Sequence, residues 1–154
     1  LVMVGIRDFF SKRLESLIQT QKISGVTFFG YATDAELRGL YEQCQAYFFP
    51  SMSEGFGLPG LEAMLYQAPV FSARSSSLPE IYGDAAHYFD PHSVEEISSS
   101  MNVALHDILE VQRLRTAGSR RVQEFSWTKM AEETKAVYEQ ALPHAPTPQT
   151  TTHH

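Results

Sequence analysis

Short, continuous apolar runs alternate with segments of helical spacing over the first two thirds of the chain. Runs this short, closed by Gly, Pro or Ser, are typical of strands covered on both faces of a parallel sheet. Residues 9–18 and 34–44 lie between such runs and carry apolar side chains every three or four positions, which predicts amphipathic helices. The predicted strands are Leu1–Val4, Val26–Phe29, Ala46–Phe49, Pro69–Ser72 and His87–Phe89.

A strand that returns parallel to its predecessor requires a crossover, and such crossovers are almost always right-handed. The fold class we predict is therefore α/β, with an open, Rossmann-like, doubly wound parallel sheet that binds its ligand at the carboxyl ends of the strands. Residues 94–109, 111–125 and 127–142 have helical spacing without a further strand. We expect one folded domain over residues 1–142, because residues 143–154 read as a disordered tail or a cloning remnant.

Composition narrows the range of functions. The 154 residues carry 12 basic and 18 acidic side chains, a net charge of −6, which argues against nucleic-acid binding. The single cysteine, Cys44, cannot form an internal disulfide, and the six histidines show no metal-ligand spacing. Neither a membrane-spanning run nor a signal peptide is recognised, so we expect a cytoplasmic protein. Leu1–Val4 opens without an initiator methionine, and we expect it to lie inside a larger protein.

The stretch from Phe49 to Met64 combines a strand end, a glycine loop and a helix start. Glycines at 55 and 57 let the backbone approach a ligand closely or adopt positive φ, and Pro59 suits the first turn of a helix. The amides of residues 56–58 can converge at the amino end of this helix. An anion is favoured there by about 0.3–1 kcal/mol when exposed and by up to about 2 kcal/mol when partly buried.

Two carboxylates, Glu54 and Glu62, flank this loop with seven residues between them. A carboxylate accepts hydroxyl hydrogen bonds, which suits a ribose or hexose and not a phosphate. Amides would then bind an anionic group, and the two acids would bind hydroxyls on either side of it. The residues alone equally allow a plain strand-to-helix turn, with Glu54 as a cap and Glu62 solvated. We interpret Ser51 as a turn cap, Arg74 as a solvated charge, and Ser75–Ser77 as capping the next helix.

The order of these motifs resembles a known family. The sequence EGFGLPGLEA, from Glu54 to Ala63, follows the Glu-x7-Glu signature of retaining glycosyltransferases with the two-domain GT-B fold, of the group 1 or family 4 type. The resemblance runs from Leu1 to about residue 142 and is to the carboxyl-terminal, donor-binding half of such an enzyme. The other matching segments are Val26–Gly30, Phe49–Ser51, Ala68–Val70, Ser76–Glu80, Gly83–Ala86 and Phe89–Pro91.

The resemblance implies transfer of a hexose from a nucleotide-diphosphate sugar to a hydroxyl acceptor, with retention of the anomeric configuration. Glu54 would be the catalytic residue, facing and orienting the donor sugar rather than attacking it. The loop amides would bind sugar hydroxyls and the diphosphate, and Glu62 would bind the ribose. No metal or other cofactor is required in the family. The donor-binding residues implied are Gly55, Phe56, Gly57, Leu58, Glu62 and Gly30.

Alternatives remain at the level of the sequence. One is a non-catalytic nucleotide-sugar-binding module, and another is a nucleotide-sugar epimerase of the same architecture, which would need acid–base His or Asp residues near the loop. In the family the acceptor, a sugar, polysaccharide or lipid-linked hydroxyl, binds to an amino-terminal domain. A lipid-linked acceptor would bring the protein to the inner membrane surface by peripheral association.

The sequence also departs from the family pattern. Family members carry one more strand before the segment that matches Leu1–Gly5, and its loop holds a Gly-Arg and a Lys-Gly that clamp the diphosphate. Neither that strand nor the amino-terminal domain is present in these 154 residues, so we expect the isolated chain to be inactive. In the doubly wound sheet the extra strand lies between Leu1–Val4 and Ala46–Phe49. Either these two strands pair directly, or an edge stays open.

Overall fold

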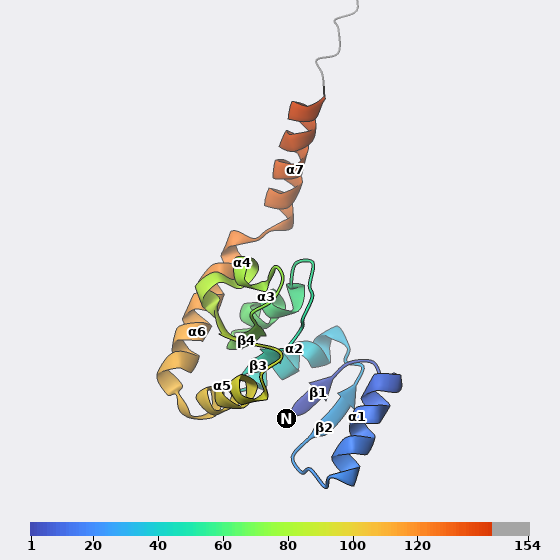
Figure 1. Ribbon diagram of the computed structural model, residues 1–154. Coiled ribbons are helices and arrows are strands. Elements are labelled where there is room, and N and C mark those ends of the chain that lie inside the picture. Colours follow the sequence, from blue (N-terminus) through green and yellow to red (C-terminus); the bar gives the residue numbers. More distant parts are fainter. Residues whose placement is uncertain (143–154) are drawn as a thin grey trace, which may run out of the picture.

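The computed structural model describes residues 1–142, and the predicted tail lies outside the described residues. Five strands alternate with helices as the sequence predicts (Figure 1). The strands are β1 (Val2–Val4), β2 (Thr27–Gly30), β3 (Tyr47–Phe49), β4 (Val70–Ala73) and β5 (Ala86–Phe89). The α-helices are α1 (Phe9–Thr20), α2 (Asp34–Gln43), α3 (Leu58–Leu65), α4 (Leu78–Tyr82), α5 (Val94–His106), α6 (Ile108–Arg121) and α7 (Trp127–Ala141). Two short 3₁₀ helices are η1 (Gly83–Ala85) and η2 (Val122–Glu124).

The strands form two parallel sheets instead of one. β1 pairs with β2, and β3, β4 and β5 form a second sheet in that order. β1 and β3 do not pair, so of the two arrangements considered for them the one with open edges is present. The predicted α/β fold class is confirmed, and the question that the sequence left open is answered by two separate sheets. Strand identity and parallel direction are confirmed because the apolar pattern defines them, whereas pairing depends on which neighbour supplies the hydrogen bonds.

Local signals explain most helix boundaries. Thr33 caps α2 in a reciprocal capping box with Glu36, and Asp8 caps α1 in the same way with Ser11. The predicted helix over residues 94–109 ends earlier, at His106. Asp107 causes this break because its side chain accepts a hydrogen bond from the amide of Glu110 at 3.0 Å, which starts α6.

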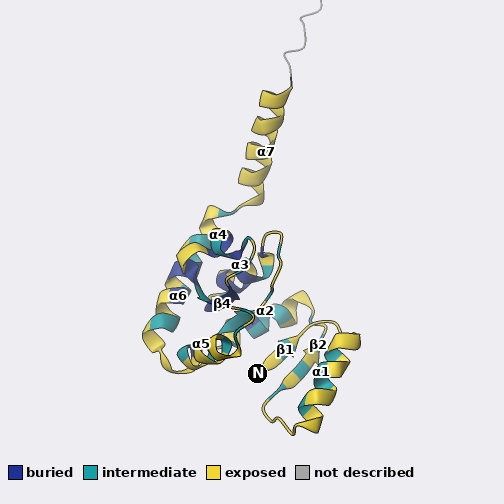
Figure 2. Ribbon diagram, viewed as in Figure 1, coloured by how far each residue is buried: buried dark blue, intermediate teal, exposed yellow. Residues whose placement is uncertain are grey.

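Burial is concentrated around the three-stranded sheet (Figure 2). Every residue of β4 is buried, with α3 and α6 packed near it. Gly118 in α6 permits this approach, because a Cβ atom there would lie 2.9 Å from Cγ of Met64. We call this sheet with α3, α4, α5 and α6 the central body. It places the loop that begins after β3 against a rigid support.

The two ends of the described chain are much more exposed. Among residues 1–40, all of which the structure describes, none is buried. We call β1, α1 and β2, residues 1–30, the amino-terminal lobe. At the other end α7 extends away from the central body and is exposed along its length (Figures 1 and 2). Within residues 1–142, none of the helices is long and apolar enough to cross a membrane.

Candidate functional site

Two loops meet at one edge of the central sheet. β3 and β4 are parallel neighbours, so their carboxyl ends lie at the same edge. Residues 50–57 follow β3 and lead into α3, while residues 74–77 follow β4 and lead into α4. Hydroxyl groups of the second loop bind the backbone of the first, as described below. We call residues 50–57 the Glu54 loop. It lies at the carboxyl ends of the strands, where this fold class binds a ligand.

Gly57 determines the shape of the turn. It is the N-cap of α3 and has a left-handed φ of 97°. A Cβ atom at this position would lie 2.6 Å from both Cδ2 of Leu78 and the hydroxyl of Tyr82, so a side chain is excluded by conformation and by space. Gly55 differs, because it has no left-handed φ and a Cβ there would meet nothing within 4 Å. Its open side leaves room for a ligand to approach the backbone.

Four consecutive backbone amides of the turn have no acceptor. Within the described residues, the N–H groups of Gly55, Phe56, Gly57 and Leu58 donate to neither backbone nor side-chain atoms. Pro59 follows at the second position of α3 and has no N–H to satisfy. Unpaired amides at a helix amino terminus carry partial positive charge and favour an anionic ligand. The chemistry predicted for this loop is therefore available in the structure.

Glu54 is held in place through its side chain and its backbone. The hydroxyl of Ser51 donates to Oε1 of Glu54 at 2.8 Å. The carbonyl of Glu54 accepts hydrogen bonds from the hydroxyls of Ser76 at 2.7 Å and Ser77 at 3.1 Å. The Glu54 amide donates to Ser76 Oγ at 3.3 Å. The carboxylate is half-buried, so one oxygen is oriented by Ser51 while the group remains accessible.

Glu62 has different surroundings. It lies on α3, four positions after Leu58, and is exposed. Its negative charge contributes to raising the pKa of Tyr41 to about 12, although burial of the phenol is the larger cause. Burial likewise raises the pKa of Tyr47, with a smaller contribution from Glu62. Glu54, by contrast, contributes to the raised pKa of Tyr82, which is mainly a burial effect.

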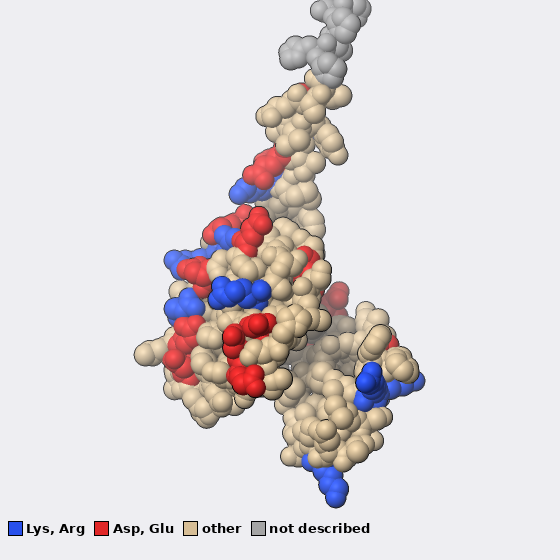
Figure 3. Space-filling model, in the orientation of Figure 1, with Lys and Arg blue, Asp and Glu red and all other residues tan. Residues whose placement is uncertain are grey.

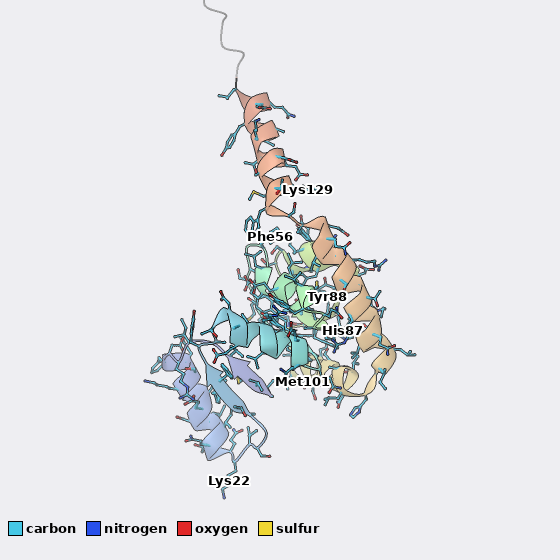
Figure 4. All side chains as sticks on the ribbon, turned by 180° about the vertical axis from the view of Figure 1, so that it is seen from behind. Lys22, Phe56, His87, Tyr88, Met101 and Lys129 are labelled. Carbon is cyan, nitrogen blue, oxygen red and sulfur yellow. The ribbon has the colours of Figure 1, made fainter. Side chains whose placement is uncertain are left out.

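Phe56 and Gly30 occupy positions that the sequence could not specify. The Phe56 ring packs edge-on against Phe125 with centroids 5.7 Å apart, close to where α7 begins (Figure 4). This contact anchors the loop, although Phe56 remains exposed. Gly30 ends β2 with a left-handed φ of 87°, and its carbonyl accepts a hydrogen bond from Gly5. It belongs to the other sheet, so strand pairing does not connect it to the Glu54 loop.

Several interpretations of minor residues are corrected by these contacts. Ser51 binds the Glu54 carboxylate, in addition to a longer 3.4 Å contact with the carbonyl of Ser53 that is typical of a turn. Ser75–Ser77 do not cap α4 with their side chains; their hydroxyls bind carbonyls of the Glu54 loop. Arg74 is exposed, as predicted for a solvated charge, and its guanidinium also stacks over the Tyr88 ring, 5.0 Å from the centroid. Sequence reasoning missed the Ser75–Ser77 contacts because they join residues more than twenty positions apart.

Charged side chains do not create a separate anion site. On the face shown in Figure 3, acidic and basic groups are interspersed over the central body. Arg113 pairs with Glu110 at 2.7 Å, and Arg121 pairs with Glu124. Across residues 1–142, His, Cys, Asp and Glu form no cluster that could hold a metal ion. Residues 50–57 contain no Lys or Arg, so the amides are the groups of this loop that carry partial positive charge.

The fold is that of the carboxyl-terminal domain of a group 1 glycosyltransferase, as the comparisons with known proteins show. The family model described as "Glycosyl transferases group 1" matches residues 1–121, and the chain belongs to this family. The chain is 35% identical over 125 residues to the serotype-specific mannosyltransferase WbdA of Escherichia coli, which covers 78% of the chain and 15% of the relative. The family assignment implied by the motifs around Glu54 is thus confirmed.

Solved structures agree on the fold. Sucrose-phosphate synthase from Thermosynechococcus elongatus superposes with a TM-score of 0.80 at 26% identity, covering 92% of this chain and 38% of that structure. Anabaena Alr3699/HepE in complex with UDP-glucose gives a TM-score of 0.75 at 20% identity, over 90% of this chain and 40% of the other. The chain therefore spans well under half the length of these three proteins, and shares the Rossmann-like α/β fold of the two solved structures.

Proposed function

We propose that this chain is the donor-binding part of a retaining glycosyltransferase that transfers a hexose from a nucleotide-diphosphate sugar to a hydroxyl acceptor. One observation carries the proposal: four consecutive free amides, those of residues 55–58, stand beside a carboxylate that Ser51 orients. Amides can hold a diphosphate, and a carboxylate can hold sugar hydroxyls. A nucleotide sugar presents both groups within one molecule.

The roles of the residues follow from this chemistry. Glu54 accepts hydrogen bonds from the hexose and fixes its orientation, while the amides at the start of α3 hold the diphosphate. During transfer the bond between the anomeric carbon and the diphosphate breaks, and negative charge grows on the leaving group. Preorganised amides stabilise that charge, so the proposed catalysis is mainly electrostatic and positional. Glu62, on the same helix, is proposed to bind the ribose hydroxyls. We propose no metal for this step.

The similar proteins support this proposal from two directions. WbdA is a mannosyltransferase, which favours a hexose as the transferred group. Anabaena HepE is solved with UDP-glucose, which favours a nucleotide sugar as the donor of a protein with this fold. The net charge of −6, and the mixture of acidic and basic groups on the face of the body shown in Figure 3, argue against a nucleic-acid ligand. The non-catalytic module and the epimerase are therefore treated as outcomes of the test.

The first test measures binding and transfer with the Glu54→Gln variant. Calorimetry on the 154-residue chain with UDP-glucose and GDP-mannose identifies the donor. Transfer is measured in the natural protein that contains this sequence, with products separated by anomeric configuration. Glu54→Gln keeps an acceptor for Ser51 but removes the charge, and we expect kcat to fall about 10²-fold or more. Glu132→Gln, on the exposed face of α7, is the matched control and is expected to leave the rate unchanged.

Three results would contradict the proposal. An unchanged kcat/KM in Glu54→Gln removes the role of this carboxylate. Donor binding without transfer by the natural protein would favour the non-catalytic module. Interconversion of two nucleotide sugars without an acceptor would favour the epimerase.

A further inference from the structure

Hydroxyl groups on one segment bind three carbonyls of the Glu54 loop. Ser75 donates to the carbonyl of Ser51 at 2.6 Å, and Ser76 donates to the carbonyl of Glu54 at 2.7 Å. At the other end of α4, Tyr82 donates to the carbonyl of Gly57 at 2.6 Å. These are among the shortest side-chain hydrogen bonds of the central body, and all come from residues 75–82. The mechanism proposed above assigns no role to this segment.

The geometry of the peptide bond gives these contacts a consequence. Residues 1–142 contain no cis peptide, and in a trans peptide the carbonyl and the following N–H point in opposite directions. Fixing the carbonyl of Glu54 toward Ser76 therefore directs the Gly55 N–H away from the β4–α4 segment. Fixing the carbonyl of Gly57 toward Tyr82 directs the Leu58 N–H away in the same manner. Both amides belong to the four without an acceptor.

Tyr82 is well suited to hold a peptide in place. Its side chain is fully buried, and it fills the space that side chains at Gly57 and Gly60 would occupy. A Cβ atom at Gly60 would lie 2.3 Å from Cζ of Tyr82. Arg121 fixes the end of α4, because its guanidinium donates to the carbonyls of Ile81 at 2.8 Å and Glu80 at 2.7 Å. The backbone next to Tyr82 is therefore fixed by Arg121, while the Tyr82 hydroxyl binds the turn.

Ser76 also shows a structural cost that its contacts offset. It has a left-handed φ of 52°, which is unfavourable for a residue other than glycine. In this conformation one hydroxyl accepts from the Glu54 amide and donates to the Glu54 carbonyl. Glycine would adopt the same φ without strain but would provide neither hydrogen bond. The conformation thus coincides with the double contact to Glu54.

We propose that Ser76 and Tyr82 are positioning residues that fix two peptide groups, so that the amides of Gly55 and Leu58 face the diphosphate of the donor. This inference rests on the proposed function and extends it to residues outside the Glu-x7-Glu motif. Each hydroxyl controls a different amide. The two residues therefore act separately, and their loss has separable effects on ligand binding.

The experiment follows backbone amide signals by NMR in ¹⁵N-labelled chain during titration with UDP, GDP and inorganic pyrophosphate. Three variants are compared with the parent chain: Ser76→Ala, Tyr82→Phe and Tyr88→Phe. Tyr88 is the matched control, because its hydroxyl donates to the carbonyl of Gly83 at 2.8 Å, outside the loop. The dissociation constant and the shifts of the Gly55 and Leu58 amides are measured in each.

We expect a crossed pattern. Ser76→Ala reduces the ligand-induced shift of the Gly55 amide and spares that of Leu58, while Tyr82→Phe does the reverse. Each of these two variants weakens binding of the diphosphate about threefold to tenfold, because one loop amide no longer donates a hydrogen bond to it. Tyr88→Phe changes neither shift. Residual contacts limit the effect, since Ser77 still binds the Glu54 carbonyl and the Gly60 amide still binds the Gly57 carbonyl at 3.2 Å.

The inference and the proposed function fail in different ways. If no amide of residues 55–58 shifts in the parent chain with any of the three probes, the proposed function is contradicted. If the parent amides shift but Ser76→Ala and Tyr82→Phe leave the shifts unchanged, or reduce both equally, the inference is wrong. Should Tyr82→Phe not fold, the exposed Ser76→Ala variant still decides the matter through the Gly55 amide alone.

Discussion

The central body and the amino-terminal lobe have the same alternating β–α–β connectivity but very different packing. In the body, β4 is paired on both edges and every one of its residues is buried. In the lobe, β1 and β2 pair only with each other, and none of residues 1–30 is buried. A strand pair with a single helix is too small to exclude water from either face. The comparison shows that burial here depends on the number of neighbouring layers more than on side-chain hydrophobicity.

The same difference separates the parts of the predicted donor site. The Glu54 loop lies on the body, where four hydroxyls from residues 75–82 bind its carbonyls. Gly30 lies on the lobe, where the backbone hydrogen bond from Gly5 is its link to the neighbouring strand. We therefore expect the loop to be preorganised for a ligand, and the region around Gly30 to contribute less to the site within these 154 residues.

The largest contrast is expected for truncation of one phenylalanine in each region. Phe71 in β4 is fully buried and stacks on Phe48, with centroids 4.9 Å apart. Phe71→Ala should lower the free energy of unfolding by about 3–5 kcal/mol, because it leaves a cavity in the body. Phe28→Ala, in the partly buried β2, should cost less than half as much. Urea unfolding of both variants measures this. Equal losses would mean that the lobe is packed as tightly as the body.

A smaller contrast is expected for glycines in tight and open surroundings. Gly60→Ala places a methyl group against the Tyr82 ring and should destabilise the chain by about 1–3 kcal/mol. Gly39→Ala, inside α2, meets nothing within 4 Å and should stabilise by about 0.5–1 kcal/mol, since alanine favours a helix. Thermal and urea unfolding give both values. Stabilisation by Gly60→Ala would contradict this prediction, because it would mean that the turn can accommodate a methyl group next to the Tyr82 ring.

The last prediction concerns the free energy of unfolding at alkaline pH, where buried tyrosines affect stability. Burial raises the pKa of Tyr41 and of Tyr88 to about 12, from an ordinary value of 10.0, and also raises that of Tyr47 and Tyr82. A group whose folded pKa is raised contributes stability below its unfolded pKa and loses it as the pH rises toward the folded value. The central body and α2, which carries Tyr41, should therefore lose stability between about pH 10 and pH 12. Urea titrations across this range measure the slope, and Tyr41→Phe should reduce it. A slope that Tyr41→Phe leaves unchanged would contradict the assignment.

Much of the fold follows from local sequence signals. Each apolar run became a strand within one residue of its predicted ends, because short β-rich runs bounded by Gly, Pro or Ser have few alternatives in an α/β pattern. The capping box at Thr33 and the cap at Asp107 fixed helix starts by hydrogen bonds within one turn. The predicted boundary at residue 109 failed because the strength of the Asp107 cap was not recognised in the apolar pattern.

The sequence by itself determined which residues form the loop: two glycines, a proline at a helix start and two acids with seven residues between them are local features whose spacing survives in any fold. It also carried the family resemblance, since that depends on residue order alone. Tertiary structure decided the rest. It decided that the strands separate into two sheets. It also brought Ser76 into contact with Glu54, and Tyr82 against Gly57 and Gly60, although these residues are about 22 to 25 positions apart. Such contacts exist only after β3 and β4 have paired and brought their loops to one edge.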